Sequence, residues 1–102
     1  KTESQINWSE AAENIIGKIN GLYPSPGAFF IYNGERYKIL KARLSLGSGE
    51  VGEVLDDQLE VSCGNKKSIK ILEIQRQGKR PQNISEFMLG SQIIKGSNLN
   101  NV

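Results

Sequence analysis

An amphipathic stretch, residues 8–20, opens the patterned part of the chain and predicts a helix. Its apolar residues recur at helical spacing and would make one buried stripe. Asn7 is placed to cap this helix, with Glu10 three residues later as its capping-box partner, and Gly21 is expected to end it. Because Trp8 belongs to the apolar stripe, we expect it to anchor the core rather than to stack on bases.

The prolines within residues 24–27 are incompatible with a helix, and beyond them the apolar period changes to that of β-strands. Asn33-Gly34 lies between two such runs and is the strongest two-residue signal for a hairpin. Glycines and paired aspartates separate the later runs, as is typical of turns. The pattern predicts five strands, over residues 28–32, 35–46, 51–55, 59–63 and 68–75.

Alternation along residues 35–46 assigns the two faces of the second predicted strand. Its even-numbered apolar residues should face the core, and Lys41 and Arg43 should then lie side by side on the exposed face. In the last strand the parity of the apolar residues slips between Ile71 and Leu72, which indicates a bulge or burial on both faces. The even-numbered apolar residues of the second strand are Leu40, Ala42, Leu44 and Leu46.

A short helix is expected to follow Asn83, which can cap it with Glu86 three residues later, and Gly90 should end it. The tail, residues 91–102, is mostly polar, and its end is expected to be loosely held. The order is thus helix, five strands and short helix in a chain of 102 residues. This order predicts a single mainly β domain with a flanking N-terminal helix: a small OB-fold-like antiparallel barrel, closed or partly open.

Charge adds a second pattern because it is segregated along the chain, although the net charge is only +2. Ten of the 13 Lys and Arg residues fall within residues 36–43 and 66–80, and between these stretches the charged residues of 50–60 are all acidic. If the fold brings the two basic stretches together, one face becomes positive and suits a polyanion. A solvated surface of mixed charge is the alternative, and the pattern alone leaves both open.

The most distinctive basic segment is residues 75–81, which combine three cations with a flexible glycine and contain no residue suited to core packing. Cations in such a loop would pair with phosphates and give salt-sensitive binding that tolerates many sequences. The aromatic residues gather near the first hairpin, where core packing is expected. Contact with the backbone of a structured RNA is therefore favoured over base-by-base reading of a single strand. The candidate nucleic-acid-binding residues are Lys41, Arg43, Lys66, Lys67, Arg76, Lys79 and Arg80.

Composition limits the chemistry that the chain can perform. With 37% apolar and 24% charged residues, no signal peptide and no long apolar run, we expect a soluble cytoplasmic protein with no membrane partner. The chain has no His, so Ser-His and Cys-His nucleophile pairs and Cys/His zinc sites are excluded. The lone Cys63 excludes an internal disulfide and should be a small buried side chain. Catalysis by carboxylates or Lys alone stays formally open.

Gly47–Gly52 formally matches the G-x-G-x-x-G pattern of dinucleotide sites. Such a site needs a helix directly after the glycines, so that the helix N-terminus meets the pyrophosphate. Residues 51–55 instead have the pattern of a strand that stops at Asp56-Asp57, so we interpret the glycines as turn residues. No catalytic, cofactor-binding or metal-binding residue is expected in this chain.

Six short segments occur in a specific order and spacing along the chain. They are Ile6–Ser9, Pro24–Phe30, Gly52–Leu55, Cys63–Gly64, Ile71–Pro81 and Phe87–Gly90. Together they resemble the carboxy-terminal domain of the methionyl-tRNA formyltransferase family over nearly the whole chain. The resemblance implies that residues 1–102 form one tRNA-binding domain, with residues 1–5 as the end of an interdomain linker and residues 91–102 as a C-terminal tail.

The family resemblance implies an OB-like barrel that holds initiator methionyl-tRNA beside a separate amino-terminal formyltransferase domain. That other domain would transfer the formyl group of 10-formyltetrahydrofolate, so no cofactor is expected in this one. The family pattern Q-R-P-G-K-K-P matches the basic loop and carries a binding role over to Arg76, Lys79 and Arg80. In two departures, Ser25 stands where the family usually has an aromatic residue, and Gln77 replaces a proline, which makes the loop less rigid.

Two other classes of function are alternatives to an auxiliary tRNA-binding domain. The same barrel could be the structural carboxy-terminal domain of a related formyltransferase or formyltetrahydrofolate hydrolase that acts on a small molecule. It could also be a free-standing module for single-stranded nucleic acid, but that would require a row of stacking aromatics on the basic face. Because a basic face serves only the binding of a polyanion, we predict the tRNA-binding role.

Overall fold

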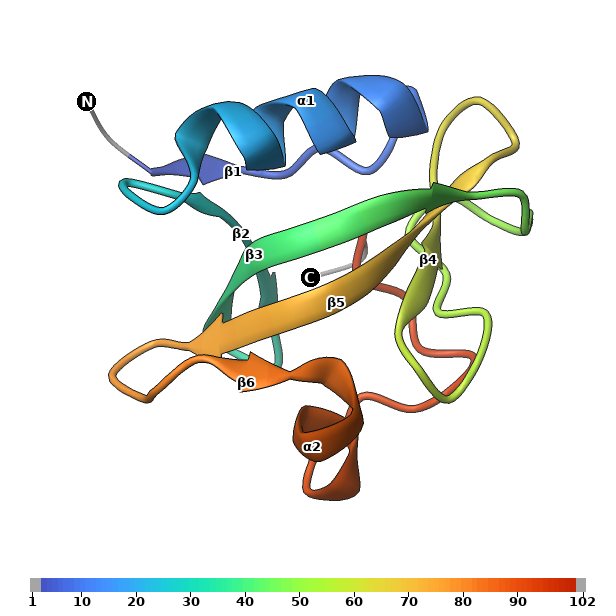
Figure 1. Ribbon diagram of the computed structural model, residues 1–102. Helices are drawn as coiled ribbons and strands as arrows, with labels where there is room; N and C mark the ends of the chain where they lie inside the picture. The colour runs from blue at the N-terminus through green and yellow to red at the C-terminus, as the bar shows by residue number, and fades with distance from the viewer. Residues whose placement is uncertain (1–2, 101–102) are drawn as a thin grey trace.

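The computed structural model describes residues 3–100, which fold into one sheet with two helices (Figure 1). The longer helix, α1, lies along β3, and the shorter α2 lies beyond β6 at the opposite end of the molecule (Figure 1). The elements are β1 Ser4–Gln5, α1 Ala12–Leu22, β2 Ala28–Tyr32, β3 Glu35–Ser45, β4 Glu60–Ser62, β5 Ser68–Arg76, β6 Gln82–Asn83 and α2 Ile84–Leu89.

The six strands form an open sheet in the order β1-β2-β3-β5-β4, with β6 also paired to β5. β1 runs parallel to β2, and the other pairs are antiparallel. Within residues 3–100 no ladder joins β4 to β1, so the closed form of the predicted barrel is not found. The prediction of a mainly β domain with a flanking helix is confirmed.

The first hairpin forms where the sequence predicts it. Tyr32 pairs with Glu35, and the two residues between them, Asn33 and Gly34, have φ angles of 51° and 79°. Two successive residues with positive φ are typical of a type I′ turn, whose twist matches that of the strands. Gly34 adopts this conformation without steric cost because it has no Cβ.

The predicted third strand, residues 51–55, is wrong. This segment makes only isolated bridges, from Glu53 to Asn98 and from Val54 to Val61. Gly52 has a φ of 84°, which is outside the β region, so the main chain bends at this residue and does not continue as an extended strand. The following strand is also shorter than predicted, since Leu59 has a φ of 61° and β4 starts one residue later.

Bulges divide β3 into two halves with different parity. Ile39 pairs with Ile74 and Lys41 with Glu73, so Leu40 has no partner of its own. Before the bulge the odd-numbered Tyr37 and Ile39 are buried, and Leu40, which is 7% exposed, is buried as well. After it the even-numbered Ala42 and Leu44 pair with the buried Ile71 and Ile69, but Leu44, near the end of the strand, and Leu46, just beyond it, are 43% and 83% exposed. The predicted burial of Leu44 and Leu46 is therefore wrong, whereas the exposure of Lys41 and Arg43 is confirmed.

The predicted bulge in β5 is confirmed. Lys41 and Ala42 pair with Glu73 and Ile71, so Leu72 is left over on β5 and is 40% exposed. Both strands therefore carry one unpaired residue close together, and such bulges increase the local twist and bend of a strand.

Helix α1 begins later than the capping signal suggests. Asn7 Oδ1 accepts from the N–H of Ser9 at 3.1 Å and so stabilises a separate turn before the helix. Ala11 occupies the N-cap position without a side-chain cap bond. Gly21 does not end the helix, which continues to Leu22, close to the proline turn.

One hydrophobic core joins both helices to the sheet. Trp8 is 2% exposed and packs edge-on against Phe30, with ring centroids 6.0 Å apart, as expected for a core anchor. Residues 91–100 are not a loose tail: Ile93 and Leu99 are each 1% exposed, and the N–H of Leu99 donates to Gly52 O. The predicted looseness of residues 101 and 102 lies outside the described residues. None of the helices described is long and apolar enough to span a membrane.

The end of β5 and helix α2 follow the sequence closely. The N–H of Glu86 donates to Asn83 Oδ1 at 2.9 Å, which confirms Asn83 as the cap of α2, and Gly90 ends the helix. Phe87 on this helix is buried and packs edge-on against Tyr37, so α2 is fixed beside the end of β5. The chain between β5 and β6 is thereby held at both of its ends.

Candidate nucleic-acid interface

The β5–β6 loop, residues 77–81, is a turn fixed by main-chain contacts. The N–H of Lys79 donates to Arg76 O at 3.0 Å, and the N–H of Gln77 donates to Arg36 O at 3.1 Å. Gly78 is the third residue of this turn and has the positive φ, 80°, that such a turn requires there. The space around it is open. The amide of Gln75 donates to Lys79 O at 2.8 Å, so the turn is tied back to β5 from a second side.

Two exposed cations, Lys79 and Arg80, lie on this turn. They line an open depression of about 580 Å³, together with the side chains that flank the loop on β5, β6 and α2. Neither forms an ion pair in the described part of the chain. A polyanion can therefore approach both cations without displacing a protein carboxylate. The other residues of the depression are Arg76, Gly78, Pro81, Gln82 and Glu86.

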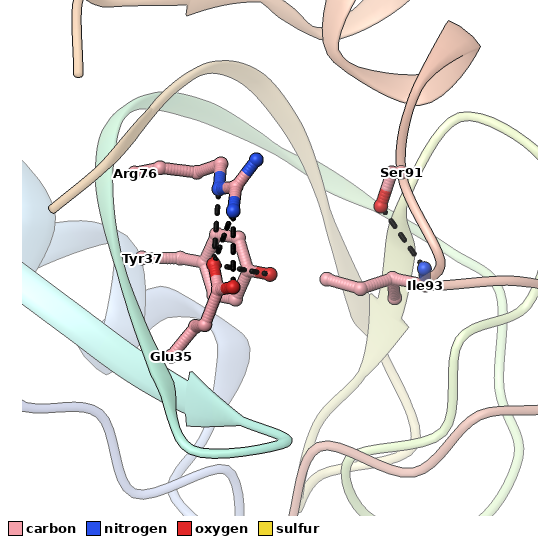
Figure 2. A network of polar contacts seen from close by, with 5 residues as sticks. All are labelled: Glu35, Tyr37, Arg76, Ser91 and Ile93. Carbon is pink, nitrogen blue, oxygen red and sulfur yellow. Dashed lines mark hydrogen bonds and ion pairs between the residues drawn. The ribbon is translucent and has the colours of Figure 1, made fainter.

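Arg76 differs from these two cations because Glu35 already binds it (Figure 2). Its Nε and Nη2 atoms donate to Glu35 Oε1 at 3.0 and 2.7 Å, and Nη2 also donates to Oε2 at 3.0 Å. The hydroxyl of Tyr37 points at the same carboxylate from 3.4 Å, and burial raises the pKa of this tyrosine. Arg76 is therefore a neutralised cation whose geometry is fixed.

A polar cavity of about 360 Å³ lies beside this ion pair. The β2–β3 hairpin forms one wall, and the corner between α2 and the following segment forms the other. In Figure 2 the pair of Glu35 and Arg76 is on one side, and Ser91, whose Oγ accepts from the N–H of Ile93 at 3.0 Å, is on the other. Arg76 lines both this cavity and the basic depression, so it lies at their boundary.

Lys41 and Arg43 lie on the face of β3 that points away from the core. Their cross-strand neighbours on β5 are Glu73 and Lys70, respectively. Arg43 thus faces a like charge directly, an arrangement that destabilises a sheet unless a counter-charge is near. Lys70 has one, since its Nζ atom is 4.0 Å from Glu60 Oε1, whereas Arg43 makes no ion pair among the residues described.

Lys66 and Lys67 lie at the far end of β5 from the basic loop. Lys66 is exposed in the turn, with a φ of 61°. Lys67 Nζ is 2.7 Å from Glu13 Oε2 on α1, and this hydrogen bond lowers the pKa of Glu13. Lys67 is thus part of the packing between the turn and α1.

The structure therefore separates the seven candidate residues into three groups. Lys79, Arg80 and Arg76 gather at one end of β5, Lys41 and Arg43 lie midway on the neighbouring strand, and Lys66 and Lys67 lie at the other end. A strand of nine residues spans roughly 25–30 Å, so the groups are too far apart to bind one small ligand together. Lys67 and Arg76 are paired with carboxylates, and the other five are not in ion pairs within residues 3–100.

Sequence reasoning missed two residues of this surface. Glu35 gave no signal, because its position opposite Arg76 depends on the pairing of β3 with β5. Arg36 belongs to a basic stretch of the sequence, but its guanidinium lies 4.0 Å from the centre of the Phe29 ring and is also paired with Glu3. Arg36 therefore packs against the sheet and is less available to a ligand.

Cys63 and the turn glycines Gly47 and Gly49 have structural roles. Cys63 is 2% exposed, and burial raises the pKa of its thiol to about 12, so it is not a nucleophile at neutral pH. The N–H groups of Gly47 and Gly49 donate to Glu60 Oε2 and Ser62 Oγ, so these turn glycines hold β4. Within residues 3–100 no three His, Cys, Asp or Glu side chains come together as a metal site.

These features define a small, mainly β domain with an exposed basic loop. The model of the family described as "Formyl transferase, C-terminal domain" matches residues 1–92. The chain belongs to this family.

Relatives with curated names extend the match over the whole chain. Methionyl-tRNA formyltransferase of Pelagibacter ubique (strain HTCC1062) is 72% identical over 102 residues, which are 100% of this chain and 33% of that protein. The protein of the same name in Paramagnetospirillum magneticum (strain ATCC 700264 / AMB-1) is 42% identical over 97 residues, 95% of this chain and 32% of that protein. The chain thus spans about a third of the length of the curated relatives it matches, and the predicted family resemblance is confirmed.

Proposed function

We propose that this chain is the tRNA-binding auxiliary domain of a methionyl-tRNA formyltransferase. In this role it positions initiator methionyl-tRNA for formyl transfer by a separate amino-terminal domain. The observation that carries the proposal is the fixed β5–β6 turn, on which Lys79 and Arg80 are exposed and free of ion pairs within the described residues. The name of the relatives, methionyl-tRNA formyltransferase, supports it.

The chemistry of the basic loop fits phosphate groups better than it fits bases. Lys and Arg side chains pair with phosphate oxygens, release the condensed counterions and so provide affinity with little dependence on sequence. Aromatic side chains that could stack on bases are mostly used in the core: Phe30 and Tyr37 are 1% and 8% exposed, and Tyr23, at 47%, is the one largely exposed aromatic within residues 3–100. This distribution supports contact with the backbone of a folded RNA rather than the reading of a single strand.

The cations on β3 and at the far turn would extend the same contact surface. Lys41, Arg43 and Lys66 are exposed, so they are available to an RNA that extends beyond the basic loop. Lys67 would have to exchange Glu13 for a phosphate, so we assign it a smaller share of the binding.

The reaction itself is assigned to the separate domain. We propose that 10-formyltetrahydrofolate binds there and that this chain contributes neither catalytic residues nor a cofactor site. The same role sets the protein in the cytoplasm, where initiator tRNA is used. We also propose that the open sheet is a partly open variant of the OB-like barrel, because its two bulged central strands wrap a single core.

The experiment that tests this proposal is a salt titration of methionyl-tRNA binding to the full-length enzyme that carries this domain. Lys79→Ala combined with Arg80→Ala should weaken binding at low salt. It should also flatten the plot of log affinity against log salt by about 0.7–0.9 for each phosphate that the variant no longer neutralises. Lys18→Ala is the control, because this cation lies on α1 and has only a loose pairing with Glu10 at 3.9 Å.

Binding of 10-formyltetrahydrofolate should be the same in all of these variants. If the double variant binds methionyl-tRNA with the affinity and salt slope of the unaltered enzyme, the tRNA-binding role of the loop is refuted. The domain would then be the structural wall of an enzyme acting on a small molecule, which was the alternative drawn from the sequence.

A further inference from the structure

The ion pair between Glu35 and Arg76 joins two segments that the chain separates widely. Glu35 is the first residue of β3, directly after the hairpin turn, and Arg76 is the last residue of β5. The Nε and Nη2 atoms of the Arg76 guanidinium both donate hydrogen bonds to Glu35, and the ammonium group of a Lys cannot reproduce this geometry. The Arg76 side chain is 41% exposed and the Glu35 side chain 47%, so the pair adds little to global stability.

The basic turn is built directly on the residue that this pair immobilises. Arg76 O accepts the hydrogen bond from Lys79 that closes the turn, and the neighbouring Gln75 side chain binds Lys79 O. The directions of the Lys79 and Arg80 side chains therefore depend on where the end of β5 is held. At the same time, Glu35 neutralises the charge of Arg76, which leaves Arg76 little attraction for a phosphate.

On this basis, and resting on the function proposed above, we propose that Glu35 and Arg76 are positioning residues for tRNA binding. The pair holds the end of β5 against the hairpin, so that Lys79 and Arg80 are ordered before the RNA arrives. Arg76 itself touches no phosphate. Binding is stronger because the free energy of the interaction with RNA is not reduced by the cost of ordering the loop.

The two possible roles of Arg76, as a phosphate ligand or as a positioning residue, predict opposite results for three variants of the full-length enzyme. If Arg76 were a phosphate ligand masked by Glu35, Glu35→Gln would free it and tighten tRNA binding with a steeper salt slope. Arg76→Lys, which keeps the charge, would then bind almost normally. If the pair positions the loop, Glu35→Gln, Arg76→Gln and Arg76→Lys should each weaken binding roughly threefold or more, and the charge-preserving Arg76→Lys should leave the salt slope unchanged.

A double-mutant cycle supplies the decisive measurement. Glu35→Gln combined with Arg76→Gln should bind tRNA as weakly as either single variant, since both remove the same ion pair. Thermal unfolding of each variant should stay close to that of the unaltered protein, which separates the effect from misfolding.

Tighter binding by Glu35→Gln, nearly normal binding by Arg76→Lys, or additive effects in the double variant would each overturn the positioning role. The same assays separate this inference from the function on which it rests. If Lys79→Ala with Arg80→Ala leaves tRNA binding unchanged, the proposed function fails. If that variant weakens binding while the Glu35 and Arg76 variants do not, only the positioning role fails.

Discussion

The main-chain N–H of Ala12, at the start of α1, donates to Oδ1 of Asn65 at 3.0 Å, although 53 positions separate the two residues. Asn65 also donates from Nδ2 to Glu13 Oε1 at 2.9 Å. The cap of this helix is thus supplied by the turn between β4 and β5 rather than by the chain that leads into the helix. The contact fastens α1 to the sheet as well as satisfying a free N–H group.

Asn65→Ala should therefore lower the free energy of unfolding by about 0.5–2 kcal/mol, the usual effect of removing a side-chain cap. Asn20→Ala is the matched control, since Asn20 is exposed on the same helix and should change stability by less than about 0.5 kcal/mol. Urea denaturation followed by circular dichroism measures both. Equal destabilisation by the two variants would show that the distant cap has no special role.

Gly64 makes a close approach of two main chains possible. A Cβ atom at this position would lie 1.8 Å from Ser9 O, and the N–H of Gly64 donates to Glu10 O at 2.9 Å. Because main-chain atoms cannot move aside cheaply, Gly64→Ala should be strongly destabilising. Gly17→Ala, in the open middle of α1, should instead stabilise the protein by up to about 1 kcal/mol. Thermal melts that shift in the same direction for both variants would contradict this account.

The faces of β3 give a stability test of the corrected register. Ile39 is 1% exposed and Leu44 is 43% exposed. Ile39→Ala should cost about 2–5 kcal/mol, as large-to-small changes in a core do, and Leu44→Ala should cost clearly less. Denaturant titrations that reverse this order would support the strict alternation read from the sequence.

Cys63 predicts how stability changes at alkaline pH. Burial raises the pKa of its thiol from 9.0 to about 12, so between these values the unfolded chain has released a proton that the folded chain keeps. The contribution to stability is complete below pH 9.0 and declines as the pH rises toward about 12. The stability of Cys63→Ala should therefore fall less steeply than that of the unaltered protein above pH 9.0. Parallel slopes in denaturation across the alkaline range would show that the thiol does not contribute.

The pairing of β3 with β5 predicts opposite effects for two neighbouring cations. Arg43→Gln removes a like charge from opposite Lys70, which Glu60 only partly offsets from 4.0 Å, and should raise stability by about 0.2–1 kcal/mol at low salt. Lys41→Gln removes the partner opposite Glu73 and should lower it by a similar amount. Both effects should fade in high salt, because the side chains are exposed. If the two variants shift the denaturation midpoint in the same direction, the cross-strand assignment is wrong.

Local signals in the sequence were sufficient for several parts of the fold. The Asn33-Gly34 hairpin, the Asn83 cap of α2, the burial of Trp8 and Cys63 and the bulge beside Leu72 are all as predicted. Each depends on residues that are adjacent in the chain or a few positions apart. Such features can be predicted because their physical cause is local.

The features that sequence reasoning missed depend on strand pairing. The parity of β3 changes at Leu40 because of a bulge opposite β5, and no residue type at that position marks it. The cap from Asn65 and the ion pair from Glu35 require knowing which distant segments meet. In the sequence the candidate site is only a set of cations. The register of β3 against β5 brings Glu35 to Arg76, so that Arg76 is bound to a carboxylate whereas, within residues 3–100, Lys79 and Arg80 are not.

The open sheet bears on aggregation, because a free strand edge can recruit the backbone of another molecule. Residues 52–55 hydrogen-bond along the outer side of β4, through Gly52, Glu53 and Leu55. At the other end of the sheet, β1 is only two residues long. Within residues 3–100 the open sheet therefore offers no long unpaired edge to which a strand of another molecule could add.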